Sequence, residues 1–162
     1  MSNSLIVYAC LGLGLSSALV GGVFQSFSDF VMRGLVWTDG AGGPQAMQQI
    51  NRTVMRSSFL FTFLALAPVS VLFALYAFAQ LDGLARNLIV AAGAVYVIAV
   101  FLVTIAGNVP MNSRLAAFDP YSPEAIEYWA TYGKVWTRWN HVRTIGSIVT
   151  AGCYLLASTR IG

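Results

Sequence analysis

The chain has 162 residues, of which 57% are hydrophobic and only 9% are charged, and its formal net charge is +3. The mean hydropathy of +0.71 exceeds what a soluble core needs, so the composition excludes an ordinary soluble domain and indicates one integral membrane domain over residues 1–162. The few basic residues are scattered, and no basic patch interleaved with exposed aromatic residues predicts a nucleic-acid partner. We therefore expect the lipid bilayer to be the main partner.

Four apolar stretches are long enough to cross a bilayer as α-helices, because a helix rises about 1.5 Å per residue and the hydrocarbon core is about 30 Å thick. They lie at residues 5–32, 57–80, 88–107 and 142–158. The first has no basic segment before its apolar run and is too long for a signal-peptide core, so we expect it to be retained as a span. The sequence thus predicts an all-α fold, an up-down bundle of four transmembrane helices.

The connections between these stretches carry helix signals of their own. In the first connection, residues 33–56, a glycine-rich breaker at 40–44 precedes a short amphipathic helix predicted at 45–55. The second connection, residues 81–87, is predicted to be a tight polar turn. In the third, residues 108–140, Ser122 is the predicted N-cap of a helix that begins at Pro123 and continues through Trp136 into the fourth span.

The charge distribution predicts the orientation in the membrane. With four spans, both termini and the second connection lie on one side, and the first and third connections lie on the other. Most basic residues belong to the first and third connections, so the positive-inside rule places these in the cytoplasm of a multi-pass protein of the cell (inner) membrane. Cys10 and Cys153 both fall inside predicted spans, and we expect packing residues rather than a disulfide or metal ligands.

Polar residues gather at one end of each predicted span, and the alternating direction of the spans brings these four ends to one membrane face. Because a buried polar stripe is least costly inside a bundle, we expect the stripes to face one another and form a pocket. Polar residues at span ends also snorkel or cap helices, and tryptophans also form interfacial belts, so each single residue has this second interpretation. The predicted pocket residues are Gln25, Asp29, Asn51, Asn108, Asn112, Trp136, Arg138, Trp139, Asn140, His141 and Arg143.

The chemistry expected of this pocket centres on three neighbours in the sequence. His141, the only histidine, is the natural proton acceptor near neutral pH, and Asn140 and Arg143 are suited to stabilising an oxyanion. Asp29 is expected to orient the imidazole or to pair with an arginine. The remaining pocket residues are the expected substrate contacts. A single histidine argues against a metal site, because transition metals usually bind several imidazole or thiolate ligands. It also excludes haem with two histidine ligands. We therefore predict no cofactor, while a metal ion or a quinone remains an alternative.

Four segments resemble the anthrone oxygenase-like family of small membrane proteins. They are FSDFVMRGL at 27–35, AMQQIN at 46–51, TIAGNVPMN at 104–112 and WTRWNHVRT at 136–144. The resemblance covers nearly the whole chain and implies a four-helix membrane domain. For some fungal members it implies oxidation of polyketide anthrones to anthraquinones by O2 without an obvious cofactor. A membrane oxygenase of this type would act on an apolar polycyclic phenol, with His141 as the base and Asn140, Arg143 or Arg138 stabilising the resulting anion.

Other functions fit the same residues. A non-catalytic membrane protein could hold a quinone, a lipid or another aromatic small molecule in the same pocket. A small transporter or an assembly partner is less favoured, because no internal repeat is visible. The first span also carries small residues that allow close helix contact within the bundle or in a homo-oligomer: Gly14, Ser17, Ala18, Gly21 and Gly22.

Overall fold

The computed structural model describes residues 2–161, and helices are the only regular secondary structure within that range. The predicted all-α class is therefore confirmed. Three π-helical segments, labelled η, interrupt two of the long helices without breaking them. In chain order the elements are α1 (Asn3–Ser26), η1 (Phe27–Val31), α2 (Met32–Val36), α3 (Gly42–Val54), α4 (Ser58–Gln80), α5 (Gly83–Val95), η2 (Tyr96–Leu102), η3 (Thr104–Asn108), α6 (Val109–Ala116) and α7 (Pro123–Ser158).

Three helices in the described range are long and apolar enough to cross a membrane, namely Asn3–Val36, Ser58–Gln80 and Gly83–Ala116. The first three predicted spans fall within these helices, apart from Ser57, which caps α4. The predicted fourth span, residues 142–158, is the C-terminal part of α7, and α7 is not among the three.

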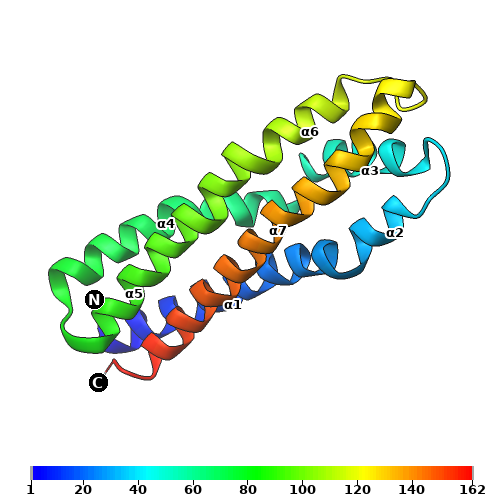
Figure 1. The fold of residues 1–162 in the computed structure, drawn as a ribbon. Helices are drawn as coiled ribbons and strands as arrows, with labels where there is room; N and C mark the ends of the chain where they lie inside the picture. The colour runs from blue at the N-terminus through cyan, green and yellow to red at the C-terminus, as the bar shows by residue number, and fades with distance from the viewer. Residues whose placement is uncertain (1, 162) are drawn as a thin grey trace.

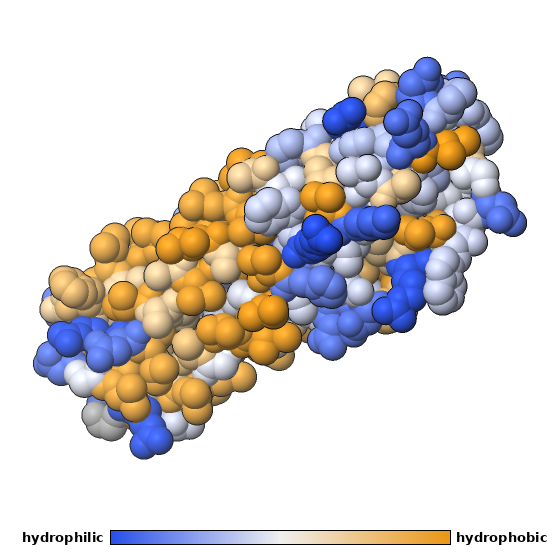
Figure 2. All heavy atoms as spheres, viewed as in Figure 1, coloured by the Kyte–Doolittle hydropathy of each residue, from blue (hydrophilic) through white to orange (hydrophobic). Residues whose placement is uncertain are grey.

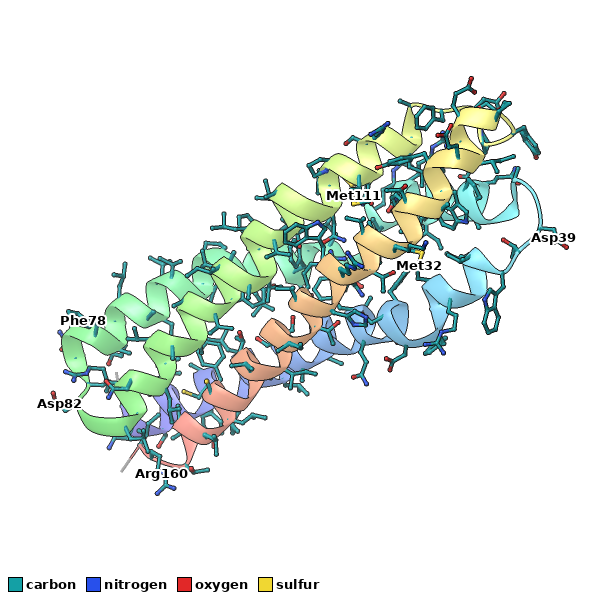
Figure 3. The ribbon with its side chains drawn as sticks, viewed as in Figure 1. Met32, Asp39, Phe78, Asp82, Met111 and Arg160 are labelled. Carbon is teal, nitrogen blue, oxygen red and sulfur yellow. The ribbon has the colours of Figure 1, made fainter. Side chains whose placement is uncertain are left out.

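The long helices lie side by side in one elongated molecule (Figure 1). Both termini lie at one end, next to the connection between α4 and α5, and Asp82 and Arg160 mark this end in Figure 3. Asp39 marks the opposite end, where α2, α3, α6 and the beginning of α7 lie. Helix α7 packs against both α1 and α5, whereas α4 packs mainly against α5.

Two of the helical runs are longer than a bilayer is thick. Each has 34 residues, which corresponds to about 51 Å against a hydrocarbon core of about 30 Å. Hydrophilic residues accordingly cover the Asp39 end of the molecule, and hydrophobic residues cover most of the other half (Figure 2). We term the elements at the hydrophilic end the cap, formed by α2, α3, α6 and residues 123–136 of α7.

The helix boundaries confirm the main sequence signals and correct two others. Ser122 caps α7 as predicted, its Oγ accepting a hydrogen bond from the Ala125 amide at 3.2 Å, and α7 runs unbroken from Pro123 to Ser158. The second connection is shorter than predicted, because the helix already begins at Gly83, where φ is +67°. The helix predicted at 45–55 begins three residues earlier, at Gly42.

The buried core continues through the length of the molecule as three groups of side chains. Cys10 lies in the group at the end with the termini and is a free thiol, as expected for a packing residue. The second group, termed the middle cluster, contains Val20, Phe24, Phe63, Leu66, Ala67, Tyr96 and Val100. The third, termed the cap cluster, contains Met32, Met47, Leu115, Trp129, Tyr132 and Trp136.

Segment η2 and helix α7 approach closely where α7 carries a glycine. A Cβ atom on Gly146 would lie 2.9 Å from the Ala99 Cβ and 3.0 Å from Val100 Cγ2, so no side chain fits there without a shift. Gly152 lies further along the same helix and has no atom within 4 Å of the corresponding position. The two glycines form a matched pair for testing this contact.

We predict that Gly146→Ala destabilises the protein by about 1–3 kcal/mol, because overpacking forces the two helices apart. Gly152→Ala is expected to be neutral or slightly stabilising, since alanine favours helix by up to about 1 kcal/mol over glycine. Thermal unfolding of the purified proteins in the same detergent measures both. Equal melting temperatures for the two variants would contradict the close contact between η2 and α7.

Candidate functional site: a buried arginine between aromatic rings

An arginine that has no carboxylate partner among residues 2–161 lies inside the molecule. The Arg143 side chain comes from α7 and is only 5% exposed. Its guanidinium carbon lies 4.2 Å from the centre of the Phe24 ring and 5.1 Å from the Trp136 ring, so the cation sits between two aromatic faces. Such cation–π contacts are worth about 2 kcal/mol when desolvated. That energy offsets part of the cost of burying the charge.

Asn140 holds this guanidinium in place. Asn140 is fully buried, and its Oδ1 accepts a 2.6 Å hydrogen bond from Nη2 of Arg143, one turn along α7. Its Nδ2 donates to the Phe24 carbonyl at 2.6 Å and to the Ser28 Oγ at 2.7 Å. Because each side of the amide has a specific partner, the amide orientation is defined, and Asn140 ties the arginine to the first helical run.

The remaining donors of Arg143 are poorly occupied. Nη1 makes a long 3.5 Å contact with the Thr104 Oγ1, and Nε is buried without a hydrogen-bond partner. Among residues 2–161 the one ion pair joins Arg86 to Asp82, at the far end of the molecule, so no described carboxylate neutralises Arg143. A buried charge of this kind is costly unless it is paired. The guanidinium thus keeps hydrogen-bond donors at Nε and Nη1 that its described neighbours do not fully occupy.

Two π-helical segments flank this group. In η1 the Met32 amide reaches back to the Phe27 carbonyl, and in η3 the Val109 amide reaches back to the Thr104 carbonyl, each five residues earlier. Ser28 lies in the first segment and Thr104 in the second, and both contact the Asn140–Arg143 pair. A π-turn widens a helix locally and is frequent at functional sites. Both neighbours of α7 therefore depart from α-helical geometry where they meet the arginine.

A second polar group lies next to it in the cap. The Asn112 Oδ1 accepts hydrogen bonds from the Tyr132 hydroxyl at 2.7 Å and from Trp136 Nε1 at 2.8 Å. Burial raises the pKa of the Tyr132 phenol, so this hydroxyl stays protonated and acts as the donor. Asn108 donates to the Trp136 carbonyl at 3.2 Å, while its Oδ1 is buried without a partner. Trp136 thus belongs to both groups, since it also covers Arg143.

Aromatic rings continue from Arg143 into the cap. Trp136 stacks on Tyr132 with 6.1 Å between ring centres, and Tyr132 stacks on Trp129 at 5.3 Å. The three rings come from one side of α7 at offsets of three and four residues, which is why they lie above one another. On the opposite side of Arg143, Phe24 contacts the rings of Phe59 and Phe63 edge to face. The guanidinium therefore lies within an aromatic environment that extends in both directions.

The structure brings four of the predicted pocket residues together around Trp136, and a fifth, Asn51, lies next to Tyr132. Arg143, Asn140 and Asn108 are buried, and Asn112 is half-buried with its oxygen bound in the interior. Asn51, at the end of α3, is half-buried and has a buried Nδ2 without a hydrogen-bond partner. The pairing of Asn140 with Arg143 follows from their spacing of three residues on one helix.

The other predicted pocket residues lie on the outside. His141, Arg138 and Trp139 are exposed on α7, and Gln25 and Asp29 are exposed on the first helical run, where they hydrogen bond to each other at 3.3 Å. Trp139 covers Gly107, where a Cβ atom would lie 2.8 Å from its ring. The expectation that all polar stripes face inward is corrected for these residues. Beyond the bilayer, water solvates an outward-facing polar side chain, so the interior is no longer its least costly location.

Sequence reasoning missed several residues of the site. Phe24 looked like any apolar residue of a span, and only its position under Arg143 gives it a role. Gln48 is 4% exposed and donates to the Leu115 and Phe118 carbonyls at 2.8 and 3.0 Å, which joins α3 to the end of α6. A glutamine on the apolar side of an amphipathic helix is the signal that would have indicated it.

The described residues provide no set of side chains that would bind a metal ion. Within residues 2–161 no three histidine, cysteine or acidic side chains come together. The side chains that hydrogen bond to Arg143 or to Asn140 carry amides and hydroxyls, and none of them is a carboxylate or an imidazole. These groups suit an anion or a neutral oxygen acceptor better than a divalent cation.

Comparison with known proteins supports the resemblance described above. The family model for anthrone oxygenase matches residues 51–153, more than half of the chain. The chain belongs to the anthrone oxygenase family. The match includes Asn140, Arg143 and Trp136 and begins at Asn51, whereas Phe24 and Ser28 lie before it. No curated protein and no solved structure matches the chain.

We predict that Asn112→Leu destabilises the cap by about 1–3 kcal/mol, because it leaves the buried donors of Tyr132 and Trp136 without an acceptor. Ser113→Ala, an exposed neighbour on the same helix, is expected to change stability by less than about 0.5 kcal/mol. Unfolding followed by tryptophan fluorescence measures both variants. If Asn112→Leu unfolded at the same temperature as Ser113→Ala, the shared acceptor Oδ1 of Asn112 would not contribute to stability.

Proposed function

We propose that this protein is a membrane-embedded oxygenase that oxidises an apolar polycyclic phenol of the anthrone type with O2. Membership of the anthrone oxygenase family supports the reaction class. The observation that carries the proposal is the buried guanidinium of Arg143, which lies between aromatic rings and has no described carboxylate partner. Flat rings and an unpaired cation are the features that a planar aromatic anion requires.

Oxidation of an anthrone by O2 proceeds through an anion that the site must stabilise. Removal of one proton from the ring CH2 group of an anthrone leaves an electron pair that delocalises onto the carbonyl oxygen. The carbon of this anion forms a bond to O2, and protonation gives a hydroperoxide. Loss of the remaining C–H proton and cleavage of the O–O bond then form the second carbonyl and release water. One O2 is consumed and one H2O is formed, so no external reductant is needed.

Arg143 is the proposed anion-stabilising residue, and Asn140 is the proposed positioning residue. A fixed donor aimed at developing negative charge acts strongly in a site that excludes water. Hydrogen bonds from Asn140 to the first helical run keep the guanidinium in one orientation before the substrate arrives. Asn108 and Asn112 are the proposed polar contacts on the cap side, next to Trp136.

His141 remains the proposed base, and its exposure sets a strict condition on that role. The side chain is exposed on α7, whereas Arg143 faces the interior. Asp29 and Gln25 are also exposed, on the first helical run. For His141 to act, the substrate must present its acidic CH2 group at the surface of α7. A His141→Ala protein that oxidised anthrone at the wild-type rate would remove His141 from the mechanism.

We predict that Arg143→Gln lowers kcat/KM for anthrone oxidation by about 100-fold or more, the usual effect of losing an oxyanion donor. Lys134→Gln, which removes an exposed cation from the same helix, is expected to leave the rate within about two-fold. Oxygen uptake and anthraquinone absorbance measure the reaction in lipid nanodiscs. Equal rates for the two variants would contradict the role of Arg143.

A second function uses the same site without chemistry. A non-catalytic protein that binds a quinone, a lipid or another aromatic molecule is favoured by one observation: the groups that contact Arg143 include no proton acceptor comparable to histidine or a carboxylate. Native mass spectrometry of the purified protein distinguishes the two functions. A tightly held aromatic ligand, together with no oxygen uptake on anthrone addition, would favour binding.

We also propose that α7 provides a fourth span, which completes a four-helix transmembrane bundle. After Val142 the outward side of α7 is apolar, and no acidic or basic residue follows Arg143 until Arg160. The exposed side chains on this stretch are Val142, Ile145, Ile148, Val149, Leu155 and Leu156. This arrangement supports contact with lipid along the C-terminal half of α7. The excess of basic residues in the first and third connections supports a cap on the cytoplasmic side of the cell membrane.

The proposed topology predicts opposite labelling of two engineered cysteines. In intact spheroplasts, Asp82→Cys is expected to react with a membrane-impermeant maleimide, and Asp39→Cys only after permeabilisation. The wild-type protein, in which Cys10 is buried and Cys153 half-buried, gives the background. Labelling of Asp39→Cys from outside would reverse the orientation, and labelling of both positions from outside would exclude four spans.

A further inference from the structure

Two grooves run along the outside of α4, one on each side of the helix. The groove between α4 and α5 has a volume of about 390 Å³ and is lined by apolar residues such as Val71, Ala74 and Val97. The groove between α1 and α4 has a volume of about 270 Å³ and is lined by Leu13, Ser16, Phe61, Thr62, Ala65, Leu66 and Val69. Both lie on the apolar half of the molecule, where lipid is the surrounding solvent. They differ in what lies beneath them.

The groove between α4 and α5 ends on helix backbone. A Cβ atom on Gly93 of α5 would lie 2.9 Å from the Ser70 carbonyl of α4 and 3.0 Å from the Ala74 Cβ. The two helices therefore touch directly at the base of this groove, and α4 packs mainly against α5. No side chain separates them that could move aside to admit a ligand.

The groove between α1 and α4 ends instead on side chains of the middle cluster. Leu66 belongs to that cluster, and Leu13 packs against it. The same cluster contains Phe63 and Phe24, whose ring centres are 6.1 Å apart, and Phe24 lies 4.2 Å below the guanidinium of Arg143. Apolar side chains thus connect the groove to the arginine, and side chains can change rotamer where backbone cannot.

The wall of this groove has features that the other groove lacks. Ser16 and Thr62 place two hydroxyl groups among its apolar residues. The Thr62 Oγ1 lies 3.0 Å from the Ser58 carbonyl, within the helix, so its lone pairs can still accept a hydrogen bond from a phenol. Pro68 lies between Ala65 and Val69 and has no amide hydrogen to donate to the Leu64 carbonyl, which makes α4 easier to bend here.

We propose that the groove between α1 and α4 is the entrance through which a planar, phenol-bearing arene passes from the lipid to Arg143. The rings of Phe59 and Phe63, stacked at 6.4 Å, line the inner part of this route. The ligand partitions into the bilayer, contacts the Thr62 side of the groove, and slides past these rings to reach the Phe24 face of the guanidinium. This inference rests on the proposed function for its substrate, but the entrance itself is tested without turnover.

Two valines on α4 provide a matched pair for the first test. Val69 lines the entrance and is 44% exposed, while Val71 lines the other groove and is 42% exposed. With anthrone as substrate in lipid nanodiscs, Val69→Trp is expected to lower kcat/KM at least ten-fold, because the indole fills the groove. Val71→Trp is expected to change it by less than two-fold. Equal effects of both substitutions, or no effect of either, would overturn the proposed entrance.

Photochemical labelling locates the ligand independently of activity. The wild-type protein in nanodiscs is irradiated with an azido-substituted anthraquinone, and the labelled peptides are identified by mass spectrometry. Adducts are expected at residues 13–16 and 61–69, and Val69→Trp is expected to reduce them at least five-fold. Adducts that favour residues 71–78 and 90–98, or that divide evenly between the two grooves, would show passive partitioning into lipid and overturn the proposal.

The two measurements separate the entrance from the reaction. Labelling at residues 61–69 without any oxygen uptake would retain the entrance and reject the oxygenase. Oxygen uptake that Val69→Trp leaves unchanged would retain the oxygenase and reject this entrance. Melting temperatures of Val69→Trp and Val71→Trp, which are expected to agree within a few degrees, show whether a lost rate reflects a blocked groove or an unfolded protein.

Discussion

The burial of one positive charge without a described negative partner organises the centre of this molecule. Placing a charge inside a membrane helix costs about 2.5–3.5 kcal/mol on insertion scales, and the neighbours of Arg143 offset that cost. Phe24 and Trp136 supply aromatic faces, and Asn140 supplies a hydrogen bond of 2.6 Å. These partners come from α1 and from α7 itself, so the arginine also fixes how these two helices meet. No carboxylate among residues 2–161 pairs with Arg143. The proposed chemistry supplies the missing negative charge as the anion of the substrate.

The site lies where two environments meet. On one side the middle cluster and its phenylalanine rings continue into the apolar half of the molecule. On the other side, Trp136, Tyr132 and Asn112 continue into the cap, where polar residues dominate the surface. An apolar polycyclic phenol has the same division, with flat rings that favour lipid and an oxygen that favours hydrogen-bond donors. The π-helical segments η1 and η3 lie at this level, and each supplies a hydroxyl group, Ser28 to Asn140 and Thr104 to Arg143.

Much of the fold was predictable because single-helix signals decide it. Apolar length located three helices that can cross a membrane, and the N-cap residue Ser122 located the start of α7. That Asn140 and Arg143 face the same side of α7 followed from the predicted polar stripe of this helix. The exposure of His141 and Asp29 did not, because the prediction assumed that every polar stripe near a span end lies in hydrocarbon. Two of the helical runs are longer than the bilayer is thick, so some of these residues lie in water. The π-turns also change which residues share one side of a helix. A hydropathy pattern reveals neither feature.

The central claim is that Arg143 binds a planar aromatic anion, and the acidity of a bound phenol tests it most directly. The visible absorbance of 1-hydroxyanthraquinone changes when its phenol ionises, so a pH titration of the complex in nanodiscs gives the pKa of the bound ligand. A neighbouring cation stabilises the ionised form, and we expect this pKa to fall by about 1–3 units relative to protein-free nanodiscs. The decrease should disappear in Arg143→Gln. A bound phenol whose pKa is unchanged in the wild-type protein would contradict the account.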